Sequence, residues 1–257
     1  VLSGANTYSG GTTISGGTLV IASDTNLGAS SGGVVLNGGA LATTSTLSSS
    51  RAVSIGASNG IIDVASSTAT TLSGVVSGSG ALTKTGDGTL VLSGANTHSG
   101  AVSITSGTLE AGGTSIAQAS VVNVATSGTF DAGAPASGYT FIKSLSGSGR
   151  VVMDADKHVK ITNGNSADVF SGVVSGGSGT GGLEVGGGTL TLSGVNTYTG
   201  NTDITGGATL KLTGNGSIAS ANTLYVSGTS GATFDISGIT GSETTVQDFY
   251  TQSGVTG

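Results

Sequence analysis

The chain of 257 residues contains no cysteine, no tryptophan and a single proline. The lack of cysteine excludes disulfides and thiolate metal sites. Charged residues make up only 8% of the chain, against about 25% in an average domain. Only seven lysines and arginines are present, too few to form a basic patch, so we expect no nucleic-acid partner.

Long hydrophobic runs are also missing. No run of about 18 apolar residues occurs that could cross a membrane as a helix, and no signal-peptide pattern stands at the N-terminus. Because the first residue already falls inside a repeated phrase, we expect the sequence to be a fragment of a longer chain.

Glycine, in contrast, is abundant, with 49 residues. Collagen is excluded because glycine does not occupy every third position. Disorder is disfavoured because the mean hydropathy is +0.27 and the aliphatic residues are regularly placed. The many Val, Ile and Thr residues favour β structure over helix.

One phrase occurs three times, as "VLSGANTYSG" at Val1–Gly10, "LVLSGANTHSG" at Leu90–Gly100 and "LTLSGVNTYTG" at Leu190–Gly200. A shorter element, Gly followed by a small residue and then an apolar anchor, recurs through most of the chain. Most anchors follow one another by about twenty residues, which is a period typical of solenoids. The anchors are Leu19, Leu41, Ile62, Leu82, Leu90, Leu109, Phe130, Leu183, Leu190, Leu210 and Phe234.

A unit of this length holds about three short strands with bends between them, which is one coil of a parallel β-helix. We therefore predict an all-β fold: one continuous β-solenoid over residues 1–257, with about twelve coils of about 20 residues stacked about 4.8 Å apart. A longer cycle restarts near residues 88 and 188. Residues 150–168 do not fit the pattern and are expected to form an irregular protruding segment.

Charge placement supports this fold, because alternate residues of a strand point to opposite faces. Six triplets carry a charge between apolar or small residues, so we expect every such charge to face water. Glycines should allow turns at positive φ, and Asn6, Asn96 and Asn196 should adopt the same left-handed conformation. His98 replaces Tyr8 and Tyr198 in the repeated phrase and is interpreted as a turn residue. The triplets are centred on Asp63, Glu110, Asp131, Glu184, Lys211 and Asp235.

The densest polar stretch is a candidate surface interaction site. Carboxylates there could bind Ca²⁺ or act as acid and base, with Asp168 close by. The alternative is a solvated strand or loop, since the charges alternate with apolar residues. We predict no catalytic residue, no metal ligand and no cofactor. The candidate surface residues are Arg150, Asp154, Asp156, Lys157, His158 and Lys160.

Glu110 and Asp131 occupy equivalent positions one coil apart. Stacking would bring their like charges close together, which is mildly destabilising. A bound cation would relieve the repulsion, and splayed side chains with water are the alternative.

The segment Gly88–Ala111, "GTLVLSGANTHSGAVSITSGTLEA", resembles the autotransporter-associated β-strand repeat of bacterial passenger regions. The resemblance implies a right-handed β-helix, displayed on or secreted from a Gram-negative cell by type V secretion. It also implies a partner, the C-terminal β-barrel translocator of the same protein. In that family the repeats are linked to export and to the stalk, and carry no known catalytic residue.

From these observations we predict a structural stalk that aids export and presents an adhesive or effector region. The first alternative is an adhesin whose rod faces bind carbohydrate or a host cell, or self-associate. A carbohydrate-active β-helix enzyme is a less favoured alternative. An ice-binding solenoid is disfavoured, because "TTI" at Thr12 does not recur coil by coil.

Overall fold

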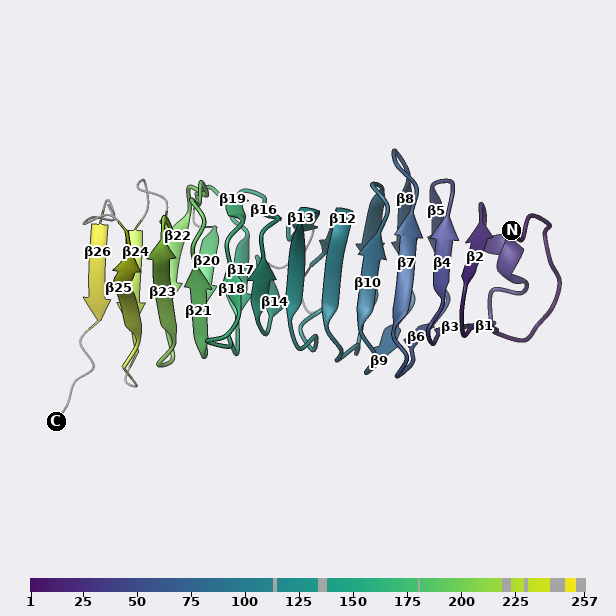
Figure 1. Cartoon of the computed structure of the whole chain (residues 1–257), viewed down its shortest axis with the longest axis horizontal. Helices are drawn as coiled ribbons and strands as arrows, with labels where there is room; N and C mark the ends of the chain where they lie inside the picture. The colour runs from purple at the N-terminus through teal and green to yellow at the C-terminus, as the bar shows by residue number, and fades with distance from the viewer. Residues whose placement is uncertain are drawn as a thin grey trace.

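The chain forms an elongated stack of parallel β-strands, with the N-terminus at one end and the last described strand, β26 (Asp248–Gln252), at the other (Figure 1). The computed structural model describes residues 1–112, 115–133, 138–179, 181–218, 223–228, 231–240 and 248–252. One short 3₁₀ helix, η1 (Asp24–Leu27), is present in this part of the chain. The predicted all-β solenoid is confirmed.

The strands form three sheets. The four-stranded sheet contains β1 (Thr12–Ile14), β3 (Val34–Leu36), β6 (Val53–Ile55) and β9 (Val76–Gly78). The six-stranded sheet contains β14 (Tyr139–Ile142), β17 (His158–Ile161), β20 (Gly182–Val185), β22 (Asn201–Ile204), β24 (Thr223–Ser227) and β26 (Asp248–Gln252). The sixteen-stranded sheet contains β2 (Thr18–Ile21), β4 (Ala40–Thr43), β5 (Leu47–Ser49), β7 (Gly60–Val64), β8 (Ala69–Leu72), β10 (Leu82–Thr85), β11 (Thr89–Leu92), β12 (Val102–Ala111), β13 (Val122–Asp131), β15 (Leu145–Gly147), β16 (Arg150–Met153), β18 (Val169–Phe170), β19 (Val173–Gly176), β21 (Thr189–Leu192), β23 (Thr209–Gly214) and β25 (Thr233–Ile239).

The solenoid has about ten turns, where the anchor spacing suggested about twelve. The difference comes from the two short anchor steps. Leu82 and Leu90 lie on β10 and β11, consecutive strands of one turn, and Leu183 and Leu190 lie on β20 and β21 of another. Each pair therefore marks one turn rather than two.

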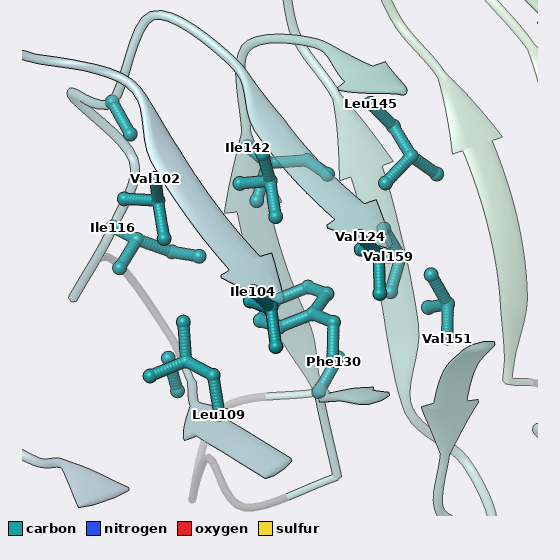
Figure 2. Close-up of a cluster of buried hydrophobic side chains, with 14 of the residues drawn as sticks. Val102, Ile104, Leu109, Ile116, Val124, Phe130, Ile142, Leu145, Val151 and Val159 are labelled. Carbon is teal, nitrogen blue, oxygen red and sulfur yellow. The ribbon is translucent and has the colours of Figure 1, made fainter. Parts of the chain in front are cut away.

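The core is a column of inward-facing apolar side chains that runs from turn to turn (Figure 2). Leu90 pairs in register with Leu109, and Leu109 with Phe130, and all three side chains are fully buried. Each turn therefore covers the apolar face of its neighbour, which no single turn could bury alone. The predicted anchors lie in this column, with Leu19 and Phe234 only partly buried.

The expectation that every triplet charge faces water is wrong for Glu184, which is 8% exposed. Two further charged residues outside the triplets, Arg51 and Lys84, are buried as well. Each of the three is accommodated by polar partners, because a buried charge without such partners would be costly.

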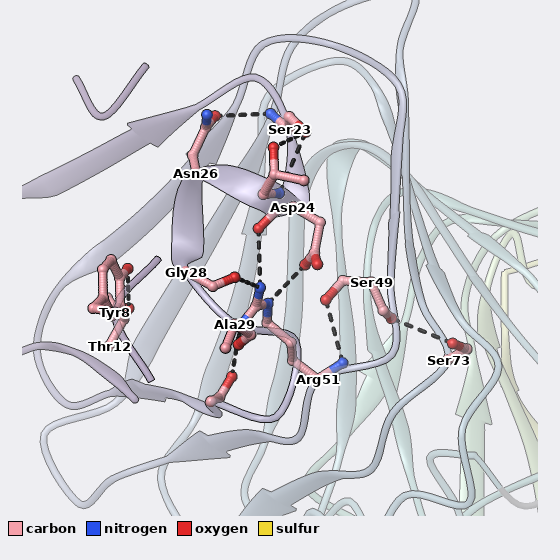
Figure 3. A network of polar contacts seen from close by, with 12 residues as sticks. Tyr8, Thr12, Ser23, Asp24, Asn26, Gly28, Ala29, Ser49, Arg51 and Ser73 are labelled. Carbon is pink, nitrogen blue, oxygen red and sulfur yellow. Dashed lines mark hydrogen bonds and ion pairs between the residues drawn. The ribbon is translucent and has the colours of Figure 1, made fainter. Parts of the chain in front are cut away.

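Arg51 holds the first turns together (Figure 3). Its Nε donates to Asp24 Oδ1 at 2.9 Å, and its Nη atoms donate to the carbonyls of Gly28 at 2.7 Å and Gly32 at 2.9 Å. These bonds tie η1 and the loop after it to the start of the next turn. Ser23 caps η1 by accepting a hydrogen bond from the Thr25 amide.

Lys84 points into the solenoid and is fully buried. Its ammonium donates to the carbonyls of Thr85 and Gly86, both at 2.7 Å, and of Ser106 at 3.3 Å. Burial lowers the pKa of Lys84 to about 8, although nearby carboxylates oppose the shift. The three carbonyls solvate the ammonium where no water reaches it.

The asparagines of the repeated phrase do not adopt positive φ, so that prediction is wrong. Among the described non-glycine residues, only Asn59, Ser67 and Asp156 have positive φ. Asn96 and Asn196 instead use their side chains to bond neighbouring turns, which requires no left-handed backbone.

Candidate functional site

The outer surface of the six-stranded sheet concentrates the ionisable and aromatic side chains of the second half of the chain. Strand alternation places one outward residue per turn in a single line along the rod. We call this line the outer row. The outer row consists of Phe141, Lys160, Glu184, Asp203, Tyr225 and Tyr250, each paired in register with the next.

An ion pair lies in the middle of the outer row. Lys160 Nζ is 2.6 Å from Glu184 Oε1, and Thr205 Oγ1 donates to the same oxygen at 3.2 Å. These partners explain why Glu184 is tolerated at low exposure. Burial, together with the negative charge of Glu184, raises the pKa of Asp203 to about 6, and Lys160 opposes the shift.

Aromatic rings flank the ion pair on the N-terminal side. The rings of Tyr139 and His158 stack with centroids 4.5 Å apart and an interplanar angle of 13°. Burial lowers the pKa of His158, and the carboxylates of Glu184 and Asp156 oppose the shift. The imidazole therefore favours its neutral form more than an exposed histidine would.

The structure separates the predicted polar cluster into two groups. His158 and Lys160 lie on β17 in the six-stranded sheet, whereas Arg150 begins β16 in the sixteen-stranded sheet. Asp154 and Asp156 lie in the exposed connection between these strands.

The remaining members of that stretch have local roles. Lys157 ends the connection, and its amide donates to the Asp154 carbonyl at 3.3 Å. Asp168 accepts a hydrogen bond from Ser144 Oγ at 2.7 Å. Residues 150–168 thus include two strands of the solenoid, β16 and β17, joined by a turn.

Four residues of the surface were not singled out as site residues from the sequence: Glu184, Asp203, Tyr225 and Tyr250. The usable signal was the turn spacing counted from Lys160. One turn after Lys160 lies Glu184, which the sequence predicts to face outward, and Asp203 follows after another turn. Because the turns in this half of the chain differ in length, the sequence does not reveal that these residues align along the rod.

Tyr225 and Tyr250 border a surface pocket of about 420 Å³ at the C-terminal end of the outer row. Asp203, Ser227 and Thr251 complete the described lining. The pocket combines two aromatic rings with a carboxyl and two hydroxyl groups, so it can contact both apolar and polar parts of a ligand.

The second carboxylate pair, Glu110 and Asp131, is paired in register as predicted. Burial raises the pKa of Glu110, and the charges of Asp131 and Asp154 raise it further. Within the described ranges, no group of three or more His, Cys, Asp and Glu side chains is arranged to hold a metal ion. No helix in the same ranges is long and apolar enough to span a membrane.

Comparison with known families identifies the repeated segments. Residues 1–21, 82–111 and 185–212 match the model of the passenger-associated-transport-repeat. The three matched segments resemble the transport repeats of autotransporter passengers. These matches cover the three copies of the phrase and confirm the resemblance found from the sequence.

A curated relative of this chain is the "Adhesin BmaC autotransporter" of Brucella suis biovar 1 (strain 1330). The two are 39% identical over 110 residues, which is 42% of this chain and 3% of the relative. The chain thus spans a small fraction of the length of the curated relative that it matches. No solved structure matches the chain.

Proposed function

We propose that this passenger segment is a stalk that promotes export and holds an adhesive or effector region away from the cell surface. The observation that carries the proposal is the continuous apolar column, in which every turn of the described solenoid rests on the one before. Such a stack lets folding propagate turn by turn from a structured end. It needs no pocket and no reactive residue.

The passenger is displayed on, or secreted from, the outer surface of a Gram-negative bacterium. Its export partner is the C-terminal translocator of the same protein. The absence of cysteine suits this route, because a disulfide formed in the oxidising periplasm would hinder passage of an extended chain. We assign the segment no catalytic role: Lys160 and Thr205 hold Glu184, and the related Brucella protein is named an adhesin.

The test compares cells that carry the complete protein with cells that carry a version lacking these 257 residues. An epitope tag at the N-terminus of the passenger reports surface display, and sedimentation reports clumping. Loss of display on deletion supports the stalk. Display that survives while attachment or clumping is lost would overturn the export role and favour the adhesin alternative. A deletion of the same length elsewhere in the passenger serves as the control.

A further inference from the structure

Two tyrosines at the C-terminal end of the outer row stack on each other. Tyr225 and Tyr250 lie on adjacent turns, with ring centroids 5.3 Å apart and an interplanar angle of 17°. They are 37% and 54% exposed, respectively. Because the planes are nearly parallel at this short distance, the rings cover part of each other and present their edges and the uncovered parts of their faces to solvent.

The surroundings of the two stacked tyrosines are polar. The pocket beside the rings is lined by the carboxyl group of Asp203 and by Ser227 and Thr251. Because its pKa is raised to about 6, Asp203 can either accept a hydrogen bond or, when protonated, donate one near neutral pH. The pocket therefore pairs an apolar floor with hydrogen-bonding groups along its side.

We propose that this pocket is a binding site for a neutral glycan, with a pyranose ring packed against the stacked pair Tyr225 and Tyr250. A pyranose has one face of C–H groups and a rim of hydroxyls, which matches an aromatic floor bordered by polar side chains. The stacked pair provides one aromatic contact for a sugar unit, and the polar lining of the pocket is within reach of the hydroxyls of the same sugar. This site goes beyond the stalk role and does not depend on it.

Other classes of ligand fit the pocket less well. An extended peptide would add to a sheet edge through its backbone, whereas this pocket lies on a sheet face whose backbone groups are used in the ladder from β22 to β26. Nucleic acid and acidic glycans would meet the carboxylates of Asp203 and Glu184 in a chain of net charge −6. A neutral glycan avoids both problems.

The experiment applies the full 257-residue chain to an array of immobilised neutral oligosaccharides and sialylated counterparts. We expect at least one neutral glycan to bind. Tyr225→Ala and Tyr250→Ala should each weaken that binding about tenfold or more. Tyr225→Phe should stay within about threefold of wild type, because the ring face is kept.

Tyr139→Ala is the matched control, since Tyr139 also stacks on the outer surface of the same sheet but lies at its other end. It should bind as wild type does. If Tyr225→Ala changes the melting midpoint, Ser227→Arg decides instead, because Ser227 lines the pocket from the same face of β24 as Tyr225, so the long side chain fills the pocket and should abolish binding. The proposal is overturned if no neutral glycan binds, if sialylated glycans alone bind, if Tyr139→Ala loses binding equally, or if binding survives in the correctly folded pocket variants. A failure of surface display in cells leaves this result unaffected.

Discussion

The second and third copies of the repeated phrase have nearly the same sequence but lie on different faces of the solenoid. From β11 of the second copy, the ladder passes through the C-terminal halves of β12 and β13 to β16 and β19. β21 of the third copy belongs to another ladder, which runs from β2 through β4, β7 and β10 to the N-terminal halves of β12 and β13 and then through β15 and β18. The third copy is therefore rotated by one face relative to the second.

This difference shows that the phrase encodes a local strand, bend and strand rather than a place on the rod. Each face of the solenoid accommodates the same element, a parallel strand whose alternate side chains point inward. The chain between the copies, residues 112–187, decides how many faces are passed before the phrase returns. Substitutions at equivalent positions of the two copies test this difference.

The largest effect is expected at the anchors. Leu90→Asp and Leu190→Asp should each destabilise the solenoid by more than about 4 kcal/mol, because each buries a charge in the apolar column. Thermal unfolding followed by circular dichroism measures the loss. Thr89→Asp, at a half-buried, outward-facing position on the strand of Leu90, is the control and should change stability little. Equal midpoints for Leu90→Asp and wild type would refute the assigned register.

A smaller and unequal effect is expected at the asparagines. Asn196 accepts from the Val174 amide at 2.8 Å and donates to the Ser217 carbonyl at 2.7 Å, so it joins three turns. Asn96 accepts from the Val76 amide at 2.6 Å, but its Nδ2 is buried without a partner.

Asn196→Ala should therefore cost about 2–3 kcal/mol and Asn96→Ala about 1–2 kcal/mol, because the first loses more hydrogen bonds. Urea denaturation of both variants against wild type measures the two costs. A larger loss for Asn96→Ala than for Asn196→Ala would contradict the bridging role of Asn196.

Asp203 of the third copy, which replaces Ser103 of the second, should make stability depend on pH. Its pKa rises from 3.8 to about 6 on folding, so the folded state holds the proton more tightly. This contribution is fully present below the unfolded pKa and is lost as the pH rises through about 6.

Asp203→Asn should therefore reduce the loss of stability between about pH 4 and about pH 7. Denaturation midpoints at the two pH values give the result. Ser103→Asp is the control, because its register partners are Thr83 and Asn123 rather than a carboxylate. An unchanged pH profile in Asp203→Asn would show that folding does not raise the pKa of the Asp203 carboxyl group.

The smallest effect is expected at His98, the counterpart of Tyr198. His98 Nε2 is 2.7 Å from the Gly80 carbonyl, and burial lowers the pKa of the imidazole, although this contact opposes the shift. The folded state then binds fewer protons than the unfolded state, so stability falls as the pH drops below about 6.5. His98→Gln should flatten this part of the pH profile, measured by thermal unfolding between about pH 5 and pH 8. A slope identical to that of wild type would attribute the loss of stability at low pH to His158 instead.

Much of the fold follows from the sequence. The period of about twenty residues predicts a solenoid, and the anchors predict its core, because an apolar residue between turns has to be buried. The repeated phrase also identifies the passenger repeats. The inward charges could not be predicted, since Arg51 and Lys84 are satisfied by backbone carbonyls whose positions depend on neighbouring turns.

The candidate surface was only partly predictable for the same reason. His158 and Lys160 stand in a visibly polar stretch, but their partners Tyr139 and Glu184 come from other turns. By itself, the sequence determined the repeating unit, because strand, bend and anchor depend on neighbours within about twenty residues. Only the tertiary structure decided which face each copy occupies and which side chains form the outer row. These features depend on the summed lengths of the intervening turns, which cannot be read from any single repeat.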